Sequence, residues 1–377
     1  MARSPAADGG KAAAARKKTI GLLTSGGDCA GLNAVIRGVV TRAVEGYGWQ
    51  VFGIRNGTMG LLRRPLQVER LEQHVTTTDM LRLGGTVLGT TNSGDPFAFP
   101  MPDGTCLDRS AEVVAGLREL GVEALIAVGG DGSLDIMRRI ARQGGLNLIG
   151  IPKTIDNDVG ATENSVGHST AVMVATEALD RLQPTAASHD RVIVMEVMGR
   201  DAGHIALAAG IAGGADVVLI PEIPYDLAVV AGHIDKLRRG GRNFALVVVA
   251  EAVPDRTGHR VFRQQSRGTA TYGGIGNILG QAIGELTGAE TRVTVLGHVQ
   301  RGGQPNWEDR LIGSAFGVHA VDLIAQEKFD RMVAWQHREV VDVPLASAIA
   351  REQQVNSDST LVRTARGLGI CLGDVCC

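Results

Sequence analysis

Charged side chains that could take part in chemistry follow a run of apolar residues in the sequence IPKTIDND, at positions 151 to 158. Asp156 and Asp158 are two residues apart, so they share one face only while the backbone stays extended. Two carboxylates held close together need a counter-charge, a bound metal or a shared proton. The pair therefore suits proton transfer or metal binding. The alternative is a polar turn in which Asp156 and Asn157 bond to the nearby backbone, and this segment alone leaves both interpretations open.

The stretch TSGGDCAGLN at 24–33 predicts a loop that binds phosphate. Gly26 and Gly27 remove side chains where a backbone would approach an anion, and the helix N-terminus that follows offers free N–H groups.

The stretch GGDGS at 129–133 repeats this arrangement farther along the chain. Gly130 and Gly132 flank Asp131, and a helix is predicted to begin at Ser133. A phosphate cradled beside an aspartate indicates Mg²⁺, which one or two carboxylates commonly hold together with phosphate oxygens. Either glycine loop alone is a weak signal, because α/β proteins contain many glycine turns. Two such loops together with TIDND favour phosphate chemistry.

Phosphoryl transfer needs a cradle for the donor, charge neutralisation on the moving group, and a carboxylate that takes the acceptor's proton. Asp156 is the candidate for that carboxylate. Arg200, in VMGRDAGH at another predicted strand end, offers a planar guanidinium for phosphate oxygens. The alternative for Arg200 is an ordinary surface salt bridge.

Further cations lie at the ends of predicted strands and indicate a site for a second anionic group, such as a sugar phosphate. They are His298, Arg301, Arg191 and Arg292. Taken singly, each would more often be a solvated charge or a buried, hydrogen-bonded histidine.

The elements that position these residues alternate between short apolar runs and amphipathic stretches. Strands are predicted at 19–25, 124–130, 146–152, 191–199, 216–222, 244–252 and 292–298. Helices are predicted at 32–44, 133–144, 169–182 and 309–325. The strands are apolar almost throughout, which is typical of parallel sheets covered by helices on both faces. An α/β fold with ligands at the carboxyl edge of its strands is therefore expected.

The composition narrows the function classes. A chain of 377 residues predicts two domains. Aromatic residues are only 3%, which argues against a stacking platform for single-stranded nucleic acid, and the net charge of −2 argues against a phosphate-coating surface. No stretch is long and apolar enough to predict a membrane span. Five scattered cysteines fit a reducing compartment, so we expect a cytoplasmic protein.

From about residue 18 to about residue 328, the chain resembles the 6-phosphofructokinases. The resemblance rests on several long motifs in order: TSGGDCAGLNAVIRG, GGDGS, PKTIDND, EVMGR and LGHVQRGGQP. It implies two Rossmann-like three-layer α/β domains with mainly parallel sheets. The expected division is a disordered tail at 1–17, a donor domain at 18–165 completed by about 280–330, a sugar-phosphate domain at 166–279, and a C-terminal extension at 331–377.

The resemblance also implies the reaction, in which a phosphoryl group moves to the 1-hydroxyl of fructose 6-phosphate. Asp156 would be the base, with Thr154 beside it, and Asp158 would order the loop or a metal. Asp131 would hold Mg²⁺, and Arg200 would stabilise the transition state. The donor's phosphates would bind to the two glycine loops, at Gly26, Gly27, Gly130, Asp131, Gly132 and Ser133.

The sugar phosphate would be surrounded by residues from several strand ends: Met198, Gly199, Glu251, His298 and Arg301, beside Thr154, Asp156 and Arg200. Arg191 and Arg292 reach the neighbouring subunit's site in this family, which implies a homodimer or homotetramer.

Two positions bear on the donor and disagree. Lys153 is the residue common in pyrophosphate users, whereas Gly132 is typical of ATP users, because pyrophosphate users usually carry Asp there. We expect ATP, since nothing at position 132 would block a nucleotide. Asn92 and Thr58 replace an arginine and an aromatic that other members place near the donor, so pyrophosphate stays the alternative.

The effector site of the bacterial enzymes is matched only in part. Arg37 and Arg242 agree with it, but Thr41, Gln183 and Gly240 do not, so weak or altered control by phosphoenolpyruvate or ADP is expected.

Two rival functions fit less of the sequence. NAD kinases and lipid kinases are similar at the GGDG loop alone. A nucleotide-sensing subunit without activity would be expected to lose the catalytic carboxylate, yet Asp156 is present.

Overall fold

The computed structural model describes residues 17–72, 77–92, 94–264 and 270–375. The predicted disordered tail, except for Lys17, lies outside the described residues.

A seven-stranded sheet forms the core of the first part of the molecule, in the order β15-β14-β7-β6-β1-β2-β3. Its strands are β1 Thr19–Thr24, β2 Gln50–Ile54, β3 Val68–Leu71, β6 Ala124–Gly129, β7 Asn147–Pro152, β14 Arg331–Gln336 and β15 Glu339–Pro344. The inner pairs are parallel, and the two edge strands β3 and β15 pair antiparallel.

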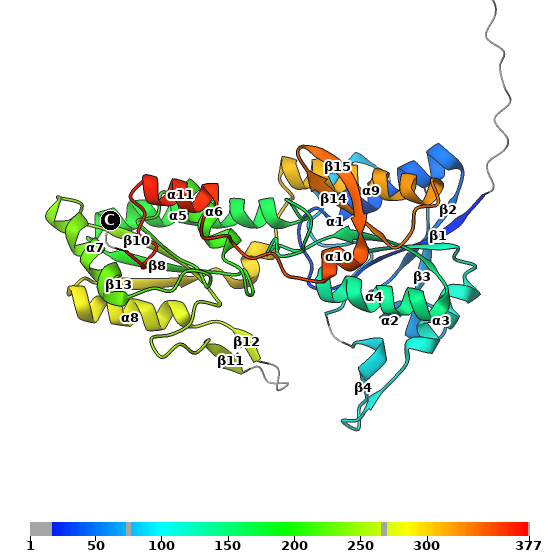
Figure 1. The fold of residues 1–377 in the computed structure, drawn as a ribbon, viewed down its shortest axis with the longest axis horizontal. Helices are drawn as coiled ribbons and strands as arrows, with labels where there is room; N and C mark the ends of the chain where they lie inside the picture. The colour runs from blue at the N-terminus through cyan, green and yellow to red at the C-terminus, as the bar shows by residue number, and fades with distance from the viewer. Residues whose placement is uncertain (1–16, 73–76, 93, 265–269, 376–377) are drawn as a thin grey trace, which may run out of the picture.

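Helices cover both faces of this sheet (Figure 1). On one face α1 Leu32–Thr41 packs against α9 Trp307–Ala325, and on the other lie α2 Met59–Leu62, α3 Ser110–Glu119 and α4 Asp131–Gly144. The α4 helix shows why the sequence folds this way: Leu134, Met137, Ile140 and Ala141 recur at helical spacing and are buried against the sheet.

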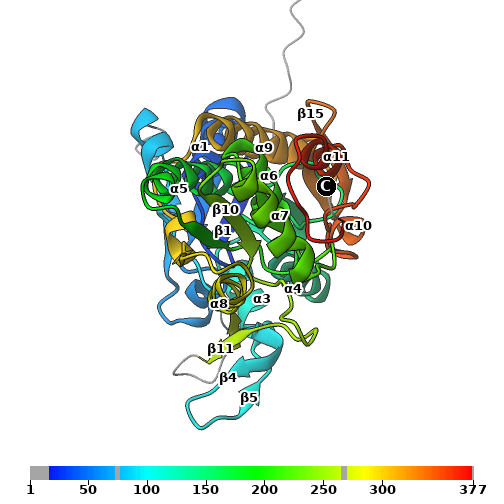
Figure 2. The ribbon, with the colours of Figure 1, turned by 90° about the vertical axis from the view of Figure 1, so that its left-hand side faces the viewer.

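A second, four-stranded sheet is parallel throughout, in the order β13-β8-β10-β9. Its strands are β8 Val192–Val197, β9 Val217–Leu219, β10 Ala245–Ala250 and β13 Thr291–Val295. Helices α5 His168–Ser188 and α6 His204–Ala212 lie on one face, and α7 Leu227–Arg239 and α8 Ile275–Thr287 lie on the other (Figure 2). Each part therefore has three layers.

Smaller elements complete the described chain. They are η1 Arg42–Gly46, η3 Thr78–Arg82, η4 Pro96–Ala98, β4 Phe99–Pro100, β5 Cys106–Leu107, β11 Phe262–Gln264, β12 Ala270–Tyr272, η5 Gly297–Arg301, α10 Leu345–Ile349 and α11 Thr360–Gly367.

The sheets divide the chain differently from the predicted ranges at two places. Strand β13 pairs in parallel with β8, so it lies in the second sheet although residues 280–330 were expected with the first part. Strands β14 and β15 extend the first sheet instead of forming a separate extension. The domain boundaries stay a prediction.

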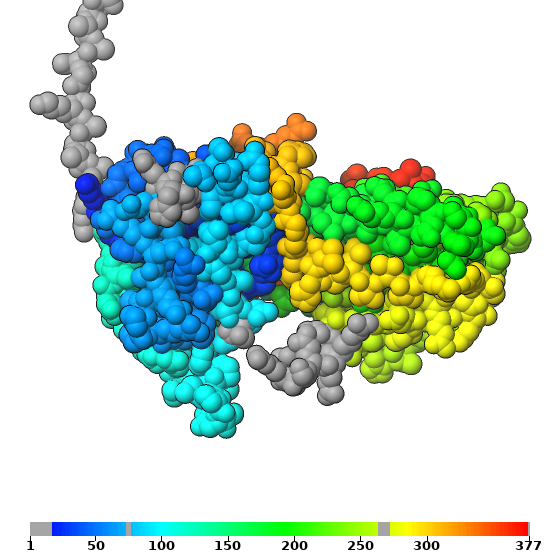
Figure 3. All heavy atoms as spheres, turned by 180° about the vertical axis from the view of Figure 1, so that it is seen from behind, coloured from blue at the N-terminus to red at the C-terminus, as the bar shows by residue number. Residues whose placement is uncertain are grey.

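The C-terminal segment joins both parts. Helix α10 packs on α4, whereas α11 packs on α6, and Cys371 forms a parallel bridge with Val217 of β9. From behind, a hollow opens between the two parts in the space-filling view (Figure 3). Within the residues that the structure describes, no helix has both the length and the apolar character needed to cross a membrane.

Candidate active site

The TIDND loop follows β7, and Asn157 gives the loop its shape. Asn157 adopts a left-handed backbone conformation, with φ of 55°. Its side-chain amide donates to the Glu163 carbonyl at 2.9 Å and accepts from the Ser165 N–H at 2.9 Å. The polar-turn interpretation therefore holds for Asn157. The neighbouring aspartates differ, because Asp156 Oδ1 and Asp158 Oδ2 are buried and accept no hydrogen bond.

Asp156 is a buried carboxylate, with 7% of its surface exposed. Its backbone N–H donates to Thr154 Oγ1 at 3.1 Å, and that hydroxyl lies 3.3 Å from Asp156 Oδ2. Burial raises the pKa of Asp156, while the nearby Arg301 guanidinium opposes the rise. A raised pKa and a free oxygen are the properties that a general base requires.

The Lys153 side chain is bonded to the first glycine loop. The buried Lys153 ammonium donates to the Gly27 carbonyl at 2.5 Å, and burial lowers its pKa. A side chain at Gly26 would meet Lys153 Nζ at 3.1 Å, and one at Gly27 would meet Arg301 Nη1 at 2.8 Å. A side chain at either position would therefore displace the Lys153 or Arg301 side chain that lies against the loop.

The second glycine loop leads into α4. The helix begins at Asp131, two residues earlier than the predicted start at Ser133, so the Asp131 carboxylate lies in the first helical turn. Gly130 precedes the helix in an extended conformation. A Cβ at Gly132 would meet no heavy atom within 4 Å, which is the open space that the sequence predicted there.

Arg200 adopts a left-handed backbone, with φ of 51°, a conformation that is strained for a side chain of this kind. The Glu251 carboxylate holds it there by accepting the N–H groups of Gly199 and Arg200, at 3.3 and 3.1 Å. Burial raises the pKa of Glu251 to about 7.

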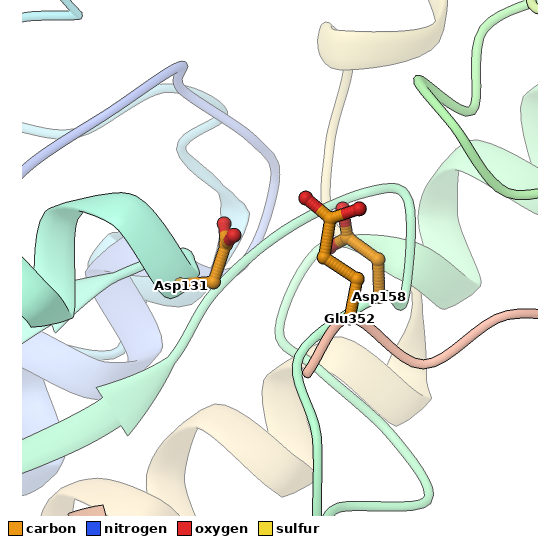
Figure 4. A group of neighbouring side chains, drawn as sticks. All are labelled: Asp131, Asp158 and Glu352. Atoms are coloured by element: carbon orange, nitrogen blue, oxygen red, sulfur yellow. The ribbon is translucent and has the colours of Figure 1, made fainter. Parts of the chain in front are cut away.

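Besides Asp201, which lies 3.9 Å away and also pairs with Arg260, three carboxylates surround the Arg200 guanidinium. Its nitrogens lie 3.2 Å from Asp131, 3.9 Å from Asp158 and 3.7 Å from Glu352. One oxygen of each carboxylate lies within 4.8 Å of the others, and Figure 4 shows the three side chains converging from a helix start and two loops. Burial, together with Asp156 and Asp131, raises the pKa of Asp158 to about 6.

The predicted sugar-phosphate residues are only partly brought together. The Met198 N–H donates to Gln300 Oε1 at 2.8 Å, which joins the end of β8 to η5. His298 is exposed on the same turn, and Arg301 donates to the Asp28 carbonyl beside the first glycine loop, at 3.2 Å.

Within one subunit, Arg191 and Arg292 lie away from the other predicted sugar-phosphate residues. Both contact Glu290, and they lie at the starts of β8 and β13, whereas Met198 and Glu251 follow strand ends. Parallel strands place their starts and ends at opposite edges of a sheet, so these arginines lie at the far edge.

A hollow of about 280 Å³ lies beside the first glycine loop. Met59, Phe99 and Thr91 are among its lining residues, and the Thr91 carbonyl accepts the Gly26 N–H at 2.8 Å. Thr58 is buried and Asn92 is exposed.

Sequence reasoning missed Glu352 and Gln300. Glu352 follows α10 in a stretch with no motif, and its approach to Asp131 depends on the path of the chain between the two sheets. Gln300 lies inside the motif GHVQRGG, where its position between His298 and Arg301 could have drawn attention.

Comparison with known proteins gives a consistent result. The family model described as Phosphofructokinase matches residues 19–324. The ATP-dependent 6-phosphofructokinase 1 of Synechocystis sp. is 61% identical over 357 residues, which are 95% of this chain and 99% of that protein. The protein of the same name from Nostoc sp. is 59% identical, over 95% of this chain and 99% of that protein.

Solved structures agree on the fold. The phosphofructokinase from Saccharomyces cerevisiae superposes with a TM-score of 0.75 at 31% identity, over 89% of this chain and 45% of the yeast chain. The pyrophosphate-dependent phosphofructokinase from Marinobacter aquaeolei has a TM-score of 0.74 at 22% identity, over 94% and 92%. The predicted α/β fold class is confirmed.

Proposed function

The chain belongs to the phosphofructokinase family, and from this premise we propose that it transfers the γ-phosphoryl group of ATP to the 1-hydroxyl of fructose 6-phosphate. The products are fructose 1,6-bisphosphate and ADP, so the reaction is a step of glycolysis. The observation that carries the proposal is the buried Asp156 carboxylate, whose Oδ1 has no hydrogen-bond donor in a loop beside both glycine loops.

Asp156 is the general base. Burial raises its pKa, so its carboxylate is a better proton acceptor than an exposed aspartate, while the Arg301 and Arg200 guanidiniums oppose that rise. Thr154 positions it through the paired contacts between its hydroxyl and Asp156. As the 1-hydroxyl oxygen attacks the γ-phosphorus, its proton moves to the free Oδ1, and the bond to the β–γ bridging oxygen of ATP breaks.

ATP is the donor that the two glycine loops favour. Gly132 leaves space beside the first turn of α4, where an aspartate would repel a nucleotide's phosphate. Lys153 is bonded to the Gly27 carbonyl from the buried side of the loop. The backbone N–H groups of Gly27, Gly130 and Ser133 are proposed to hold the phosphates. Gly26 is proposed to contribute by lacking a side chain, because its N–H already donates to the Thr91 carbonyl.

Mg²⁺ fits the residues present. Asp158 Oδ2 is buried without a hydrogen-bond donor, and the Asp131 carboxylate lies near it. Oxygen ligands of this kind are those that Mg²⁺ prefers. Asp131, with Asp158, would hold the ion, which when bound neutralises charge on the donor's phosphate oxygens.

Arg200 stabilises the transferring group. Arg200 follows β8 of the second sheet, and its guanidinium reaches Asp131 at the start of α4. It therefore connects the loop after β8 with the second glycine loop. A planar guanidinium is suited to the equatorial oxygens of a phosphoryl group in transfer.

The sugar phosphate is proposed to bind at the strand ends of the second sheet. Met198, Gly199 and Glu251 form one side, and His298 and Arg301 lie on the turn opposite. The contact between Met198 and Gln300 supports this grouping.

Arg191 and Arg292 are proposed to serve the site of a neighbouring subunit in a homodimer or homotetramer. Their place at the far edge of the second sheet supports this role. Self-association has further support from Trp307 and Leu311, which are 74% and 54% exposed on α9.

The nucleoside is proposed to occupy the hollow lined by Met59 and Phe99, since that hollow adjoins the first glycine loop. A cytoplasmic location is proposed from Cys29 and Cys106, which are free thiols.

The test is an initial-rate assay with fructose 6-phosphate and Mg²⁺, with ATP and pyrophosphate supplied separately and the product identified. Turnover with ATP and little with pyrophosphate is expected. Turnover with pyrophosphate alone would contradict the donor, and no fructose 1,6-bisphosphate from either would contradict the reaction.

A further inference from the structure

The stretch from residue 350 to 356 runs between the two sheets and is fixed by residues of both parts. The Gln353 N–H donates to the Asp158 carbonyl at 2.6 Å, and His204 Nε2 lies 2.9 Å from the Gln353 carbonyl oxygen. The Val355 N–H donates to Glu222 Oε1 at 2.8 Å. We call this stretch the C-terminal strap. It lies beyond the part of the chain that the family model matches, which ends at residue 324.

These bonds determine where Glu352 lies. Gln353 is bonded to the backbone of Asp158, and a carboxylate oxygen of the preceding Glu352 lies within 4.8 Å of an oxygen of the Asp158 carboxylate. Figure 4 shows the Glu352 and Asp158 carboxylates side by side, with Asp131 facing them.

The charges in this group do not balance. Asp131, Asp158 and Glu352 contribute −3 when ionised, and Asp201 beside Arg200 contributes a further −1. The Arg200 guanidinium and Arg260, which pairs with Asp201, contribute +2, which leaves −2. A divalent cation would neutralise that difference. Uncompensated like charges at such distances are unfavourable, so the group favours an additional cation.

A second observation points to a ligand independently of the charge count. Asp158 is 2% exposed, and its Oδ2 faces the group without any hydrogen-bond donor. Its nearest cation, Arg200 Nη1, is 3.9 Å away, beyond hydrogen-bonding distance. A buried carboxylate oxygen left in this state is normally bonded to a proton donor or a metal.

We propose that Glu352 belongs to the carboxylate set that binds the divalent cation, so that the C-terminal strap completes the cation site of the proposed kinase. The Glu352 carboxylate binds the ion directly or through one of the waters that Mg²⁺ retains. The cation and the Arg200 guanidinium then compete for the same three carboxylates. The inference rests on the proposed function for the role of the ion, but not for its binding.

The test is titration of the nucleotide-free full-length protein with Mn²⁺, following free Mn²⁺ by electron paramagnetic resonance. Glu352→Gln keeps the size and removes the charge, and we expect it to weaken Mn²⁺ binding about tenfold or more. Glu352→Asp withdraws the carboxylate by one methylene and is expected to bind with intermediate affinity. Glu339→Gln, an exposed change in β15, is the matched control and is expected to bind like the unchanged protein.

Arg200→Met provides an opposite test, since removing the competing guanidinium is expected to tighten Mn²⁺ binding several-fold. Equal Mn²⁺ affinity for the unchanged protein and Glu352→Gln, with both folded by thermal melting, would overturn the proposal. Failure of the proposed function is distinguished by assaying the unchanged protein for fructose 6-phosphate phosphorylation, because the Mn²⁺ titration needs no substrate.

Discussion

Lys153 Nζ donates a hydrogen bond to the carbonyl oxygen of Gly27, 2.5 Å away. The lysine lies at the end of β7 and the glycine in the loop after β1, so this bond fixes the first glycine loop to the strand that leads to Asp156. A residue that by type indicated a pyrophosphate donor therefore bonds to the protein's own backbone in this chain. This contact explains how the chain combines Lys153 with an ATP-type Gly132.

Replacing Lys153 by Met should loosen the first glycine loop without changing the donor. The Gly27 carbonyl loses its partner, so unfolding in denaturant is expected to require about 1 to 3 kcal/mol less free energy. The KM for ATP should rise, while the KM for fructose 6-phosphate changes little. Lys328→Met, at an exposed surface ion pair, is the control. A change of donor to or from pyrophosphate would show that Lys153 selects the donor directly.

Gly132→Asp should impair ATP use while leaving the fold intact. A Cβ at position 132 meets no heavy atom within 4 Å, and an aspartate in the first turn of a helix is favourable, so the melting temperature should not fall. Its charge would repel the donor's phosphates, and we expect the KM for ATP to rise at least about tenfold, as for about 1.4 kcal/mol of lost binding. Gly232→Asp also enters open space on a helix and is the control. An unchanged KM for ATP would mean that the bound donor does not lie next to position 132.

The raised pKa of Glu251 predicts that the free energy of unfolding depends on pH. Burial raises its pKa from 4.5 to about 7, so the folded protein holds the proton more tightly than the unfolded chain. This stabilising contribution is full below about pH 4.5 and is lost as the pH rises through about 7. Glu251→Gln can still accept the N–H groups of Gly199 and Arg200, and it is not subject to that loss.

Glu251→Gln should therefore be more stable than the unchanged protein at pH 8, by about 1 to 3 kcal/mol, and the gain should shrink toward pH 5. Denaturant unfolding across this range in EDTA measures the difference. The exposed Glu119→Gln is the control. A gain that does not depend on pH would contradict the assignment of the raised pKa to Glu251.

Regulation by phosphoenolpyruvate or ADP should be weak. Arg242, one of the two matching effector-site residues, is paired with Asp216 at 2.9 Å, and three other positions lack the expected residues. Fructose 6-phosphate saturation curves with and without millimolar phosphoenolpyruvate are expected to differ by less than about twofold in half-saturation. A curve that becomes strongly sigmoidal would refute this.

The strands and the positions of the loops between them could be predicted from the sequence, because these depend on local patterns. Near-continuous apolar runs identified β1, β6 and β7, and the loops that follow them hold Gly27, Asp131 and Asp156. Asn157 could also be anticipated as a turn residue. The pairing of strands was less predictable, since β13 and β14 joined sheets through contacts between distant segments.

Glu352 shows where sequence reasoning fails. Nothing in the residues around it indicates a ligand, and only the bonds from Gln353 and Val355 to both parts place its side chain beside Asp158. Lys153 is a related case: its residue type indicated a phosphate ligand, whereas in the structure its buried ammonium donates to the Gly27 carbonyl.

The most direct test of the central claim is to measure turnover and sugar-phosphate binding for Asp156→Asn with ATP and Mg²⁺. The substitution keeps the size of the side chain and removes the proton acceptor, so kcat should fall by about 10² to 10⁴-fold. Fructose 6-phosphate binding, measured by calorimetry, should change less than about threefold. Asp180→Asn, exposed on α5, controls for the substitution. Near-normal turnover in Asp156→Asn would contradict the assignment of Asp156 as the base, and with it the account of this site.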